Sequence, residues 1–175
     1  MILHEPAPVP VGVKGDEPLT EEDGRPRARG LTYTHVQDGV RKWSLTAEGA
    51  RFDEASDKLV LQGVQIDFFP KKGGWVTILG DTGQYDQKSR VITLIGHVWG
   101  RTNAGLTLVT DKITYSDKEQ LVTTKSMVTI SGARFSVRGV GMTADLAKNT
   151  LTFKRRVYSI FTPAGKGPPP GVTAD

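Results

Sequence analysis

The apolar residues of this chain lie in short runs that alternate with polar residues or are rich in Val, Ile and Thr. Such runs are typical of β-strands, whereas an amphipathic helix repeats its apolar positions about every 3.6 residues. Polar clusters separate the runs and are typical of turns. Asp38-Gly39 predicts one tight hairpin, because both residues tolerate positive φ. The pattern predicts about nine strands and no helix, with runs at 44–47, 59–61, 76–79, 91–95, 106–110, 121–124, 135–137 and 151–153.

An internal repeat organises these runs, because four segments superpose: 43–65, 76–98, 106–128 and 135–157. Each copy holds two runs joined by a polar turn, so it cannot bury its apolar side alone and neighbouring copies are expected to stack. The seven-residue spacing inside a copy also occurs in coiled coils, but the intervening Thr, Val and Gly disfavour a helix. Three apolar columns result: Leu45, Ile78, Leu108 and Val137; then Phe52, Tyr85, Tyr115 and Ala144; then Leu59, Ile92, Val122 and Leu151.

The two ends of the chain differ from this repeating part. Residues 1–30 contain five prolines and no apolar period, and residues 163–175 contain four more prolines. Neither end has enough apolar surface to offset the entropy of ordering it. We therefore expect a flexible tether at 1–30, one β domain at 31–162, and a flexible tail at 163–175.

The overall composition narrows the classes of function only slightly. The net charge is +4 with a pI of about 9.4, which fits either a solvated surface or attraction to an anionic partner. There is no cysteine, so disulfides, thiolate nucleophiles and Cys-based metal sites are excluded. No apolar run is long enough to span a bilayer, and the first residues do not form a signal peptide. The chain is thus either cytosolic or trimmed of a targeting segment, a possibility that its Pro-rich start keeps open.

Catalytic chemistry finds little support in the sequence. His4, His35 and His97 are the only histidines, and none lies in a metal-binding or nucleophile motif. The segment 139–144 (GVGMTA) lacks the Lys and the following helix of a phosphate loop, and its glycines better suit a β-bulge. We expect no enzyme activity, no metal and no cofactor.

The charged positions also have structural interpretations. A column of short polar residues closes the strands before the turns, where such side chains bond local backbone; its members are Asp53, Asp86, Ser116 and Asp145. The basic run 154–156 lies in the last strand. If Phe153 and Val157 point inward there, Arg155 also points inward. The run either protects an edge strand from aggregation or contacts lipid phosphates or an acidic partner. Nucleic-acid binding is not expected, since the aromatics lie in the columns instead of among the basic residues.

Four stretches in this order and spacing resemble one known family. They are Asp38-Gly39 leading to 43–52 (WSLTAEGARF), then 92–98 (ITLIGHV), then 108–115 (LVTDKITY) with 122–124 (VTT), and finally 139–145 (GVGMTAD) followed by Leu151. Together they resemble LptC, the periplasmic component of the lipopolysaccharide export machinery, and more distantly the related bridge protein LptA. The resemblance covers roughly residues 31–161, about three-quarters of the chain.

This resemblance implies a twisted, open β-jellyroll whose apolar interior holds the acyl chains of lipid A. It also implies that the protein is periplasmic and accepts lipopolysaccharide from the inner-membrane Lpt ABC transporter at its N-terminal edge. It would then pass the lipid to an LptA-like bridge protein at its C-terminal edge. LptC proteins usually carry an N-terminal membrane anchor, and this sequence shows none. Membrane tethering is therefore expected only through an anchor outside this sequence.

Two sets of residues follow from these expectations. The interior that would bind lipid comprises Leu45, Phe52, Leu59, Ile78, Tyr85, Ile92, Leu108, Tyr115, Val122, Val137, Met142 and Leu151. The edges that would meet partners comprise Tyr33, Val36, Phe153, Val157 and Tyr158. Two alternatives stay open: a soluble LptA-like bridge component, and a structural β-repeat module whose interior is filled by its own side chains.

Overall fold

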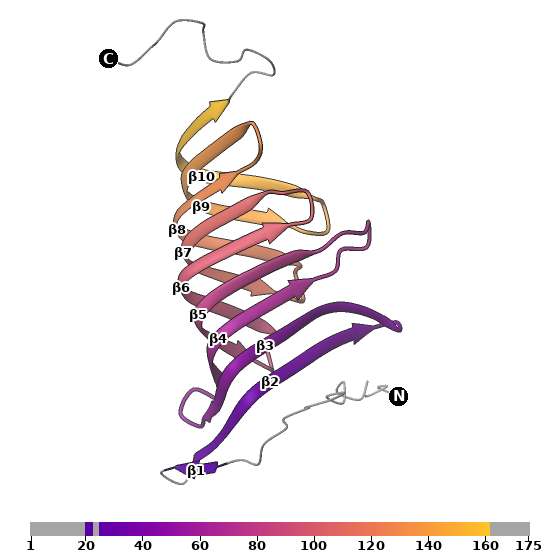
Figure 1. The fold of residues 1–175 in the computed structure, drawn as a ribbon, viewed down its shortest axis with the longest axis vertical. Helices are drawn as coiled ribbons and strands as arrows, with labels where there is room; N and C mark the ends of the chain where they lie inside the picture. The colour runs from indigo at the N-terminus through magenta and orange to yellow at the C-terminus, as the bar shows by residue number, and fades with distance from the viewer. Residues whose placement is uncertain (1–19, 23–24, 162–175) are drawn as a thin grey trace, which may run out of the picture.

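The described part of the protein folds into one antiparallel β-sheet. The structure is a computed structural model and describes residues 20–22 and 25–161. Its strands lie in chain order across the sheet, each paired with the next, and no helix occurs within the described ranges (Figure 1). The predicted all-β jellyroll built from successive hairpins is confirmed. The strands are β1 (Thr20–Glu22), β2 (Arg25–Gln37), β3 (Val40–Asp53), β4 (Lys58–Phe68), β5 (Val76–Asp86), β6 (Val91–Thr102), β7 (Thr107–Ser116), β8 (Leu121–Ser131), β9 (Phe135–Asp145) and β10 (Thr150–Phe161).

The turns repeat as the sequence does. Asp38 and Gly39 have φ of 54° and 72° and join β2 to β3, as the Asp-Gly pair predicts. The turns at the other ends of the strands each finish on a left-handed residue, namely Asp57, Arg90, Gln120 and Asn149. This shared geometry keeps the hairpins in register from one repeat to the next.

Each long strand bends near its middle, and the bend reverses which residues face inward. In β5, Ile78 and Tyr85 are both buried although they are seven residues apart, whereas Asp81 and Thr82 between them are both exposed. In a straight strand, residues seven apart face opposite sides. Because two consecutive residues face outward at the bend, the alternation is reversed beyond it. Side chains from both columns of a repeat therefore face the same interior.

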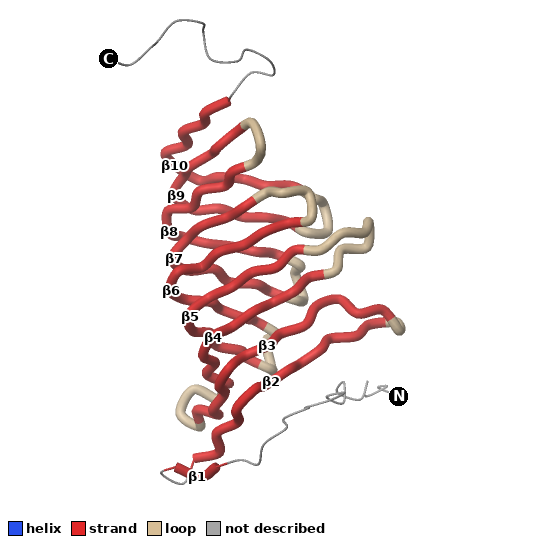
Figure 2. The backbone as a smooth tube through the Cα atoms, in the orientation of Figure 1, coloured by secondary structure: helices blue, strands red, loops and turns tan. Residues whose placement is uncertain are grey.

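The bend folds the sheet over into two layers that face each other. Most of the turns gather on one side of the stack, opposite the folded side (Figure 2). The first layer contains residues 31–47, 64–68, 76–80, 98–102, 107–110, 128–131 and 135–139. The second contains residues 49–53, 58–62, 82–86, 91–95, 112–116, 121–124 and 142–145.

The inward side chains of both layers form a single apolar core. Leu61, Val98 and Val128 are completely shielded from solvent, and Trp43 and Ile92 retain only 1 % exposure. Tight packing of this kind is typical of a protein interior and supplies most of the stability of the fold.

The described residues include 31–161 of the predicted domain and residues 20–22 and 25–30 of the expected tether. Residues 1–19, 23–24 and 162–175 lie outside the described residues, so the expected tail at 163–175 and most of the expected tether fall outside them. Strand β2 begins at Arg25, within the segment expected to be a tether. Its Pro26 lies in the short pairing with β1, a position at the start of a strand where proline is tolerated. Within the described ranges no helix is long and apolar enough to cross a membrane.

Candidate functional site

Most of the residues predicted to line the interior do face it. Those that are buried are Leu45, Ile78, Tyr85, Ile92, Tyr115, Val122 and Met142. Leu59 and Leu108 are partly buried and pack against this core, and Val137 is half-buried. The repeat columns therefore contain part of the core. Their role in lipid binding stays a prediction.

Two members of that set lie at the surface. Phe52 is 36 % exposed and Leu151 is 47 % exposed. Both are close to strand ends, Phe52 before the β3–β4 turn and Leu151 after the β9–β10 turn. A column assigned by sequence spacing cannot distinguish a central position from one at the rim of the sheet, where fewer residues lie opposite.

Aromatic rings join the two layers along the side that carries the turns. We call Tyr33, Trp43, Phe68, Tyr85 and Tyr115 the aromatic seam. Tyr85 of the second layer lies 5.7 Å from Tyr33 and 6.0 Å from Trp43 of the first layer, measured between ring centroids. Phe68 and Tyr115 meet edge to face at 4.7 Å. Such tilted and edge-on contacts add stabilisation beyond the area buried. Each of these contacts links a strand of the first layer to a strand of the second layer that comes two or three strands later in the chain. The two layers are therefore staggered.

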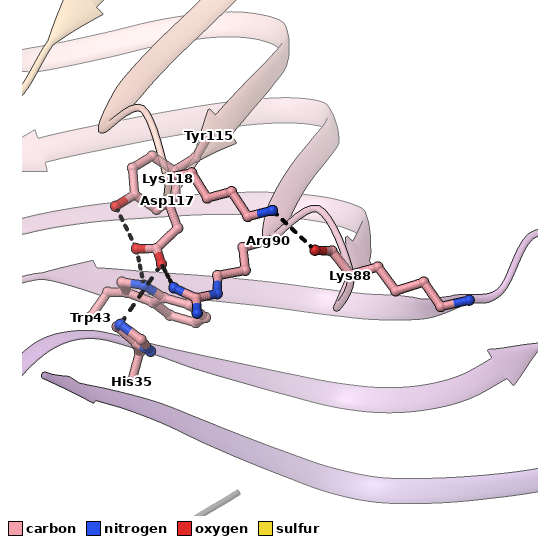
Figure 3. Close-up of polar contacts among 7 residues, drawn as sticks. All are labelled: His35, Trp43, Lys88, Arg90, Tyr115, Asp117 and Lys118. Carbon is pink, nitrogen blue, oxygen red and sulfur yellow. Dashed lines mark hydrogen bonds and ion pairs between the residues drawn. The ribbon is translucent and has the colours of Figure 1, made fainter. Parts of the chain in front are cut away.

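A buried carboxylate anchors the seam. Asp117 opens the β7–β8 turn, and its Oδ1 accepts hydrogen bonds from Trp43 Nε1 at 3.0 Å and from the Tyr115 hydroxyl at 3.2 Å. Its Oδ2 lies 3.7 Å from both His35 Nε2 and Arg90 Nη1 (Figure 3). The side chains of His35 and Asp117 are each only 10 % exposed. The turn between β7 and β8 is thereby fastened to β2 and β3 across the opening between the layers.

Burial keeps the hydroxyls of Tyr85 and Tyr115 protonated. Desolvation raises the pKa of Tyr85 far above its ordinary value, with the neighbouring Tyr33 as the next cause. Desolvation also raises the pKa of Tyr115, and the charge of Asp117 adds to the rise. A neutral Tyr115 hydroxyl remains a donor to the Asp117 carboxylate at every physiological pH.

The interior is closed at its N-terminal part and more open at its C-terminal end. The seam and Asp117 fasten strands β2 to β7. At the other end, Phe135 meets Phe161 at 6.4 Å, but these residues belong to neighbouring strands and not to facing layers. Phe161 is 70 % exposed. The first-layer half of a strand faces the second-layer half of a strand that comes later in the chain. No described strand follows β10, so the first-layer halves of β9 and β10 are not covered in this way.

The C-terminal edge strand exposes apolar side chains. Val157, Tyr158 and Ile160 of β10 are all more than half exposed, and among the described residues no strand pairs with the outer side of β10. The pairing of β9 with β10 shifts register between Arg155 and Tyr158, and Arg156 has a φ of 48°. This bulge interrupts the regular alternation on which the predicted inward direction of Arg155 and Val157 depends, and both residues are exposed.

The other predicted edge residues differ from one another. Phe153 packs against the core, and Tyr33 packs against it as part of the aromatic seam, so both side chains face the interior. Val36 is 47 % exposed on β2. The outer side of β2 pairs with β1 only at Arg25–Arg27 within the described part of the chain.

Two members of the predicted polar column, Asp86 and Asp145, bond the backbone of their turns as the sequence predicts. Asp86 accepts hydrogen bonds from the backbone N–H of Lys88 and Ser89, and Asp145 accepts one from Lys148. These bonds hold the pKa of both carboxyls below the ordinary value. His97 lies at the bulge in β6, where its Nδ1 is 2.5 Å from Asp81 Oδ2. Within the described ranges no group of His, Asp and Glu is arranged to hold a metal ion.

The Asp117 cluster is the part of the site that the sequence did not predict. Asp117 contacts Trp43 across 74 residues, and neither residue lies in a motif that signals the contact. Asp117 occupies a turn cluster, where an aspartate is already explained by local bonding. Only the fold-over and the stagger of the layers bring the two together.

The fold and the site together define an open, antiparallel β-jellyroll with an apolar interior, whose edge strands β2 and β10 are largely unpaired on their outer sides among the described residues. In a comparison with protein families, the family described as lipopolysaccharide-assembly, LptC-related, matches residues 17–161. The chain belongs to the LptC family. No curated protein matches the chain in a sequence comparison. Membership in this family places the protein in lipopolysaccharide transport, among periplasmic proteins that are associated with transport and are not known as enzymes.

Proposed function

We propose that the protein binds the acyl chains of lipid A between its two layers and passes lipopolysaccharide along a protein bridge. It accepts the lipid from the inner-membrane Lpt transporter at the β2 edge and delivers it to an LptA-like protein at the β10 edge. The residues that precede β2 act as a tether leading to a membrane anchor outside this sequence. The protein supplies no energy of its own, so the transporter drives the movement.

One observation carries this proposal: a single sheet presents inward apolar side chains from β2 to β10 and ends in an apolar edge strand whose outer side no described strand pairs with. Acyl chains need a continuous apolar surface that excludes water. An unpaired strand is a template on which another sheet can continue, so the apolar surface can extend into a partner without interruption. The family match supports the same proposal.

The C-terminal contact can be tested in cells. Deleting residues 151–175 removes β10 and should abolish binding to an LptA-like bridge protein, while the contact made by β2 survives if the remaining sheet folds. A photo-crosslinker at Tyr158, whose side chain is 70 % exposed on β10, should capture the bridge protein. The same crosslinker at Val36 on β2 serves as the matched position and should capture the transporter. If Val36 captures the bridge protein and Tyr158 does not, the assignment of the two edges is reversed.

A second candidate function rests on the packing of the interior. Leu61, Val98 and Val128 have no exposed surface, so in this structure the protein's own side chains fill the space between the layers there. A purely structural module that joins other proteins through its edges needs no more than this. Mass spectrometry of the purified protein distinguishes the two functions, because a transfer protein retains lipopolysaccharide and a structural module retains none.

A further inference from the structure

A second pattern runs along the folded side of the sheet, where each strand bends. Glycines occupy this position in several strands, and they adopt positive φ: 57° at Gly63 and 82° at Gly96. Glu48 lies directly opposite Gly63 in the pairing of β3 with β4, and Asp81 lies beside Gly96 in the pairing of β5 with β6. We call this row of glycines and charged residues the bend ladder.

In the bend ladder, a carboxylate side chain from the neighbouring strand covers Gly63 and Gly96. A Cβ atom added to Gly63 would lie 2.5 Å from Cδ of Glu48, and one added to Gly96 would lie 2.6 Å from Oδ2 of Asp81. These separations are too short for real atoms, so the glycines leave room for the carboxylates. In both pairs the carboxylate comes from the preceding strand, whereas Gly141 in β9, which has a φ of 74°, is covered by the side chain of Lys154 from the following strand.

Gly30 is the member of the bend ladder that no described residue covers. It precedes Gly63 by 33 residues, which is also the spacing from Gly63 to Gly96. It has a φ of 70°, and no atom of the described residues lies within 4 Å of the place where its Cβ would be. It lies opposite Glu48, whose side chain turns toward Gly63 instead. The preceding strand β1 ends its pairing with β2 at Arg27, short of Gly30.

The residue beside Gly30 indicates the charge of a side chain that would cover this glycine. The carboxylate of Asp81, which covers Gly96, also bonds His97, the next residue along the chain. Gly30 is flanked by Arg29, which is exposed at the same unpaired edge. A guanidinium prefers a carboxylate partner and repels a cation.

We propose that the strand which docks on the β2 edge carries an aspartate or glutamate opposite Gly30, where the carboxylate covers the glycine and pairs with Arg29. This rests on the proposed docking of the transporter at that edge and specifies the chemistry of its strand. We call the space beside Gly30 the socket. It favours a docking strand that has an aspartate or glutamate at its own bend. Docking in a shifted register places another residue there and loses the ion pair.

Paired variants test the socket in the full-length protein, with a photo-crosslinker at Val36 and the native inner-membrane transporter as partner. Gly30→Asn fills the socket, and Gly39→Asn is its control, since Gly39 has a φ of 72°, is also unobstructed, and lies in a turn. Asn tolerates this backbone conformation, so both variants should fold. Arg29→Glu reverses the edge charge, and Arg101→Glu is the control in β6, in the middle of the sheet.

We expect Gly30→Asn and Arg29→Glu to lower the cross-linking yield about tenfold and the controls to leave it unchanged. The captured strand should contain Asp or Glu opposite Gly30, and changing that residue to Lys should restore capture by Arg29→Glu. If capture occurs but neither edge variant lowers it, docking at β2 stands and the socket is wrong. If the crosslinker at Val36 captures residues 1–19 of the same chain, or captures nothing, then neither the docking of the transporter at the β2 edge nor the acidic residue opposite Gly30 is supported. A crosslinker at Tyr158 then shows whether the C-terminal half of the proposed function survives.

Discussion

Replacing Asp117 should loosen the whole N-terminal part of the jellyroll. Asp117→Ala removes the acceptor of the Trp43 and Tyr115 hydrogen bonds, which measure 3.0 and 3.2 Å, and leaves the buried Trp43 Nε1 without this partner. Hydrogen bonds to a charged group contribute about 1.5–3 kcal/mol each, and the loss is partly relieved wherever water enters. The contacts with His35 and Arg90, both at 3.7 Å, add at most about 1 kcal/mol, because Arg90 is well exposed. We expect a loss of about 2–4 kcal/mol in the free energy of unfolding.

Chemical denaturation followed by circular dichroism measures this loss. Glu119→Ala is the matched control, because it removes a carboxylate from the same turn at an exposed position and should change stability by no more than about 0.5 kcal/mol. A double-mutant cycle with Trp43→Phe, which keeps a ring but removes the donor, should give a coupling energy of about 1–2 kcal/mol. If Asp117→Ala resembles Glu119→Ala, or if the coupling is near zero, the carboxylate does not fasten the layers and the reasoning fails.

The remaining predictions concern the interior, the last strand and the bend. Leu108→Asp should weaken lipopolysaccharide binding at least tenfold in a pull-down, because an unpaired charge facing the core is costly; a folded variant that binds normally would contradict this. The protein without residues 151–175 should fail to retain an LptA-like partner in the same assay. The bond from Asp81 raises the pKa of His97, so Asp81→Asn should lower that pKa toward 6.5 in an NMR titration. Since the folded pKa is the raised one, the stabilisation is complete below about pH 6.5 and disappears as the pH rises through the folded pKa.

The core could be predicted from the sequence because repetition fixes it. Residues such as Leu45 and Ile78 recur at the same place in each copy, and a hairpin with one apolar side must bury that side. The Asp38-Gly39 hairpin was predictable for a local reason, since few residue pairs tolerate two left-handed conformations. In both cases the determining physics lies within a few residues or within one repeat.

The contacts between the layers could not be predicted in this way. Two columns seven residues apart share one interior only because a bend reverses the strand between them, and the sequence does not show how the resulting layers are offset. That offset decides that Asp117 meets Trp43. The bulge beside Arg156 interrupts the alternation of β10, and no glycine in the sequence signals it. These features follow from the arrangement of the whole sheet.

Photo-crosslinking at two adjacent residues of β7 tests the central claim most directly. The side chain of Leu108 packs against the core, whereas that of Val109 is 52 % exposed on the opposite face of the same strand. If lipopolysaccharide passes between the layers, a crosslinker at position 108 captures it in cells with an active transporter, and one at position 109 does not. Capture at both positions or at 109 alone would place the lipid outside the jellyroll. No capture at either position would leave the protein a structural connector and contradict transport through its interior.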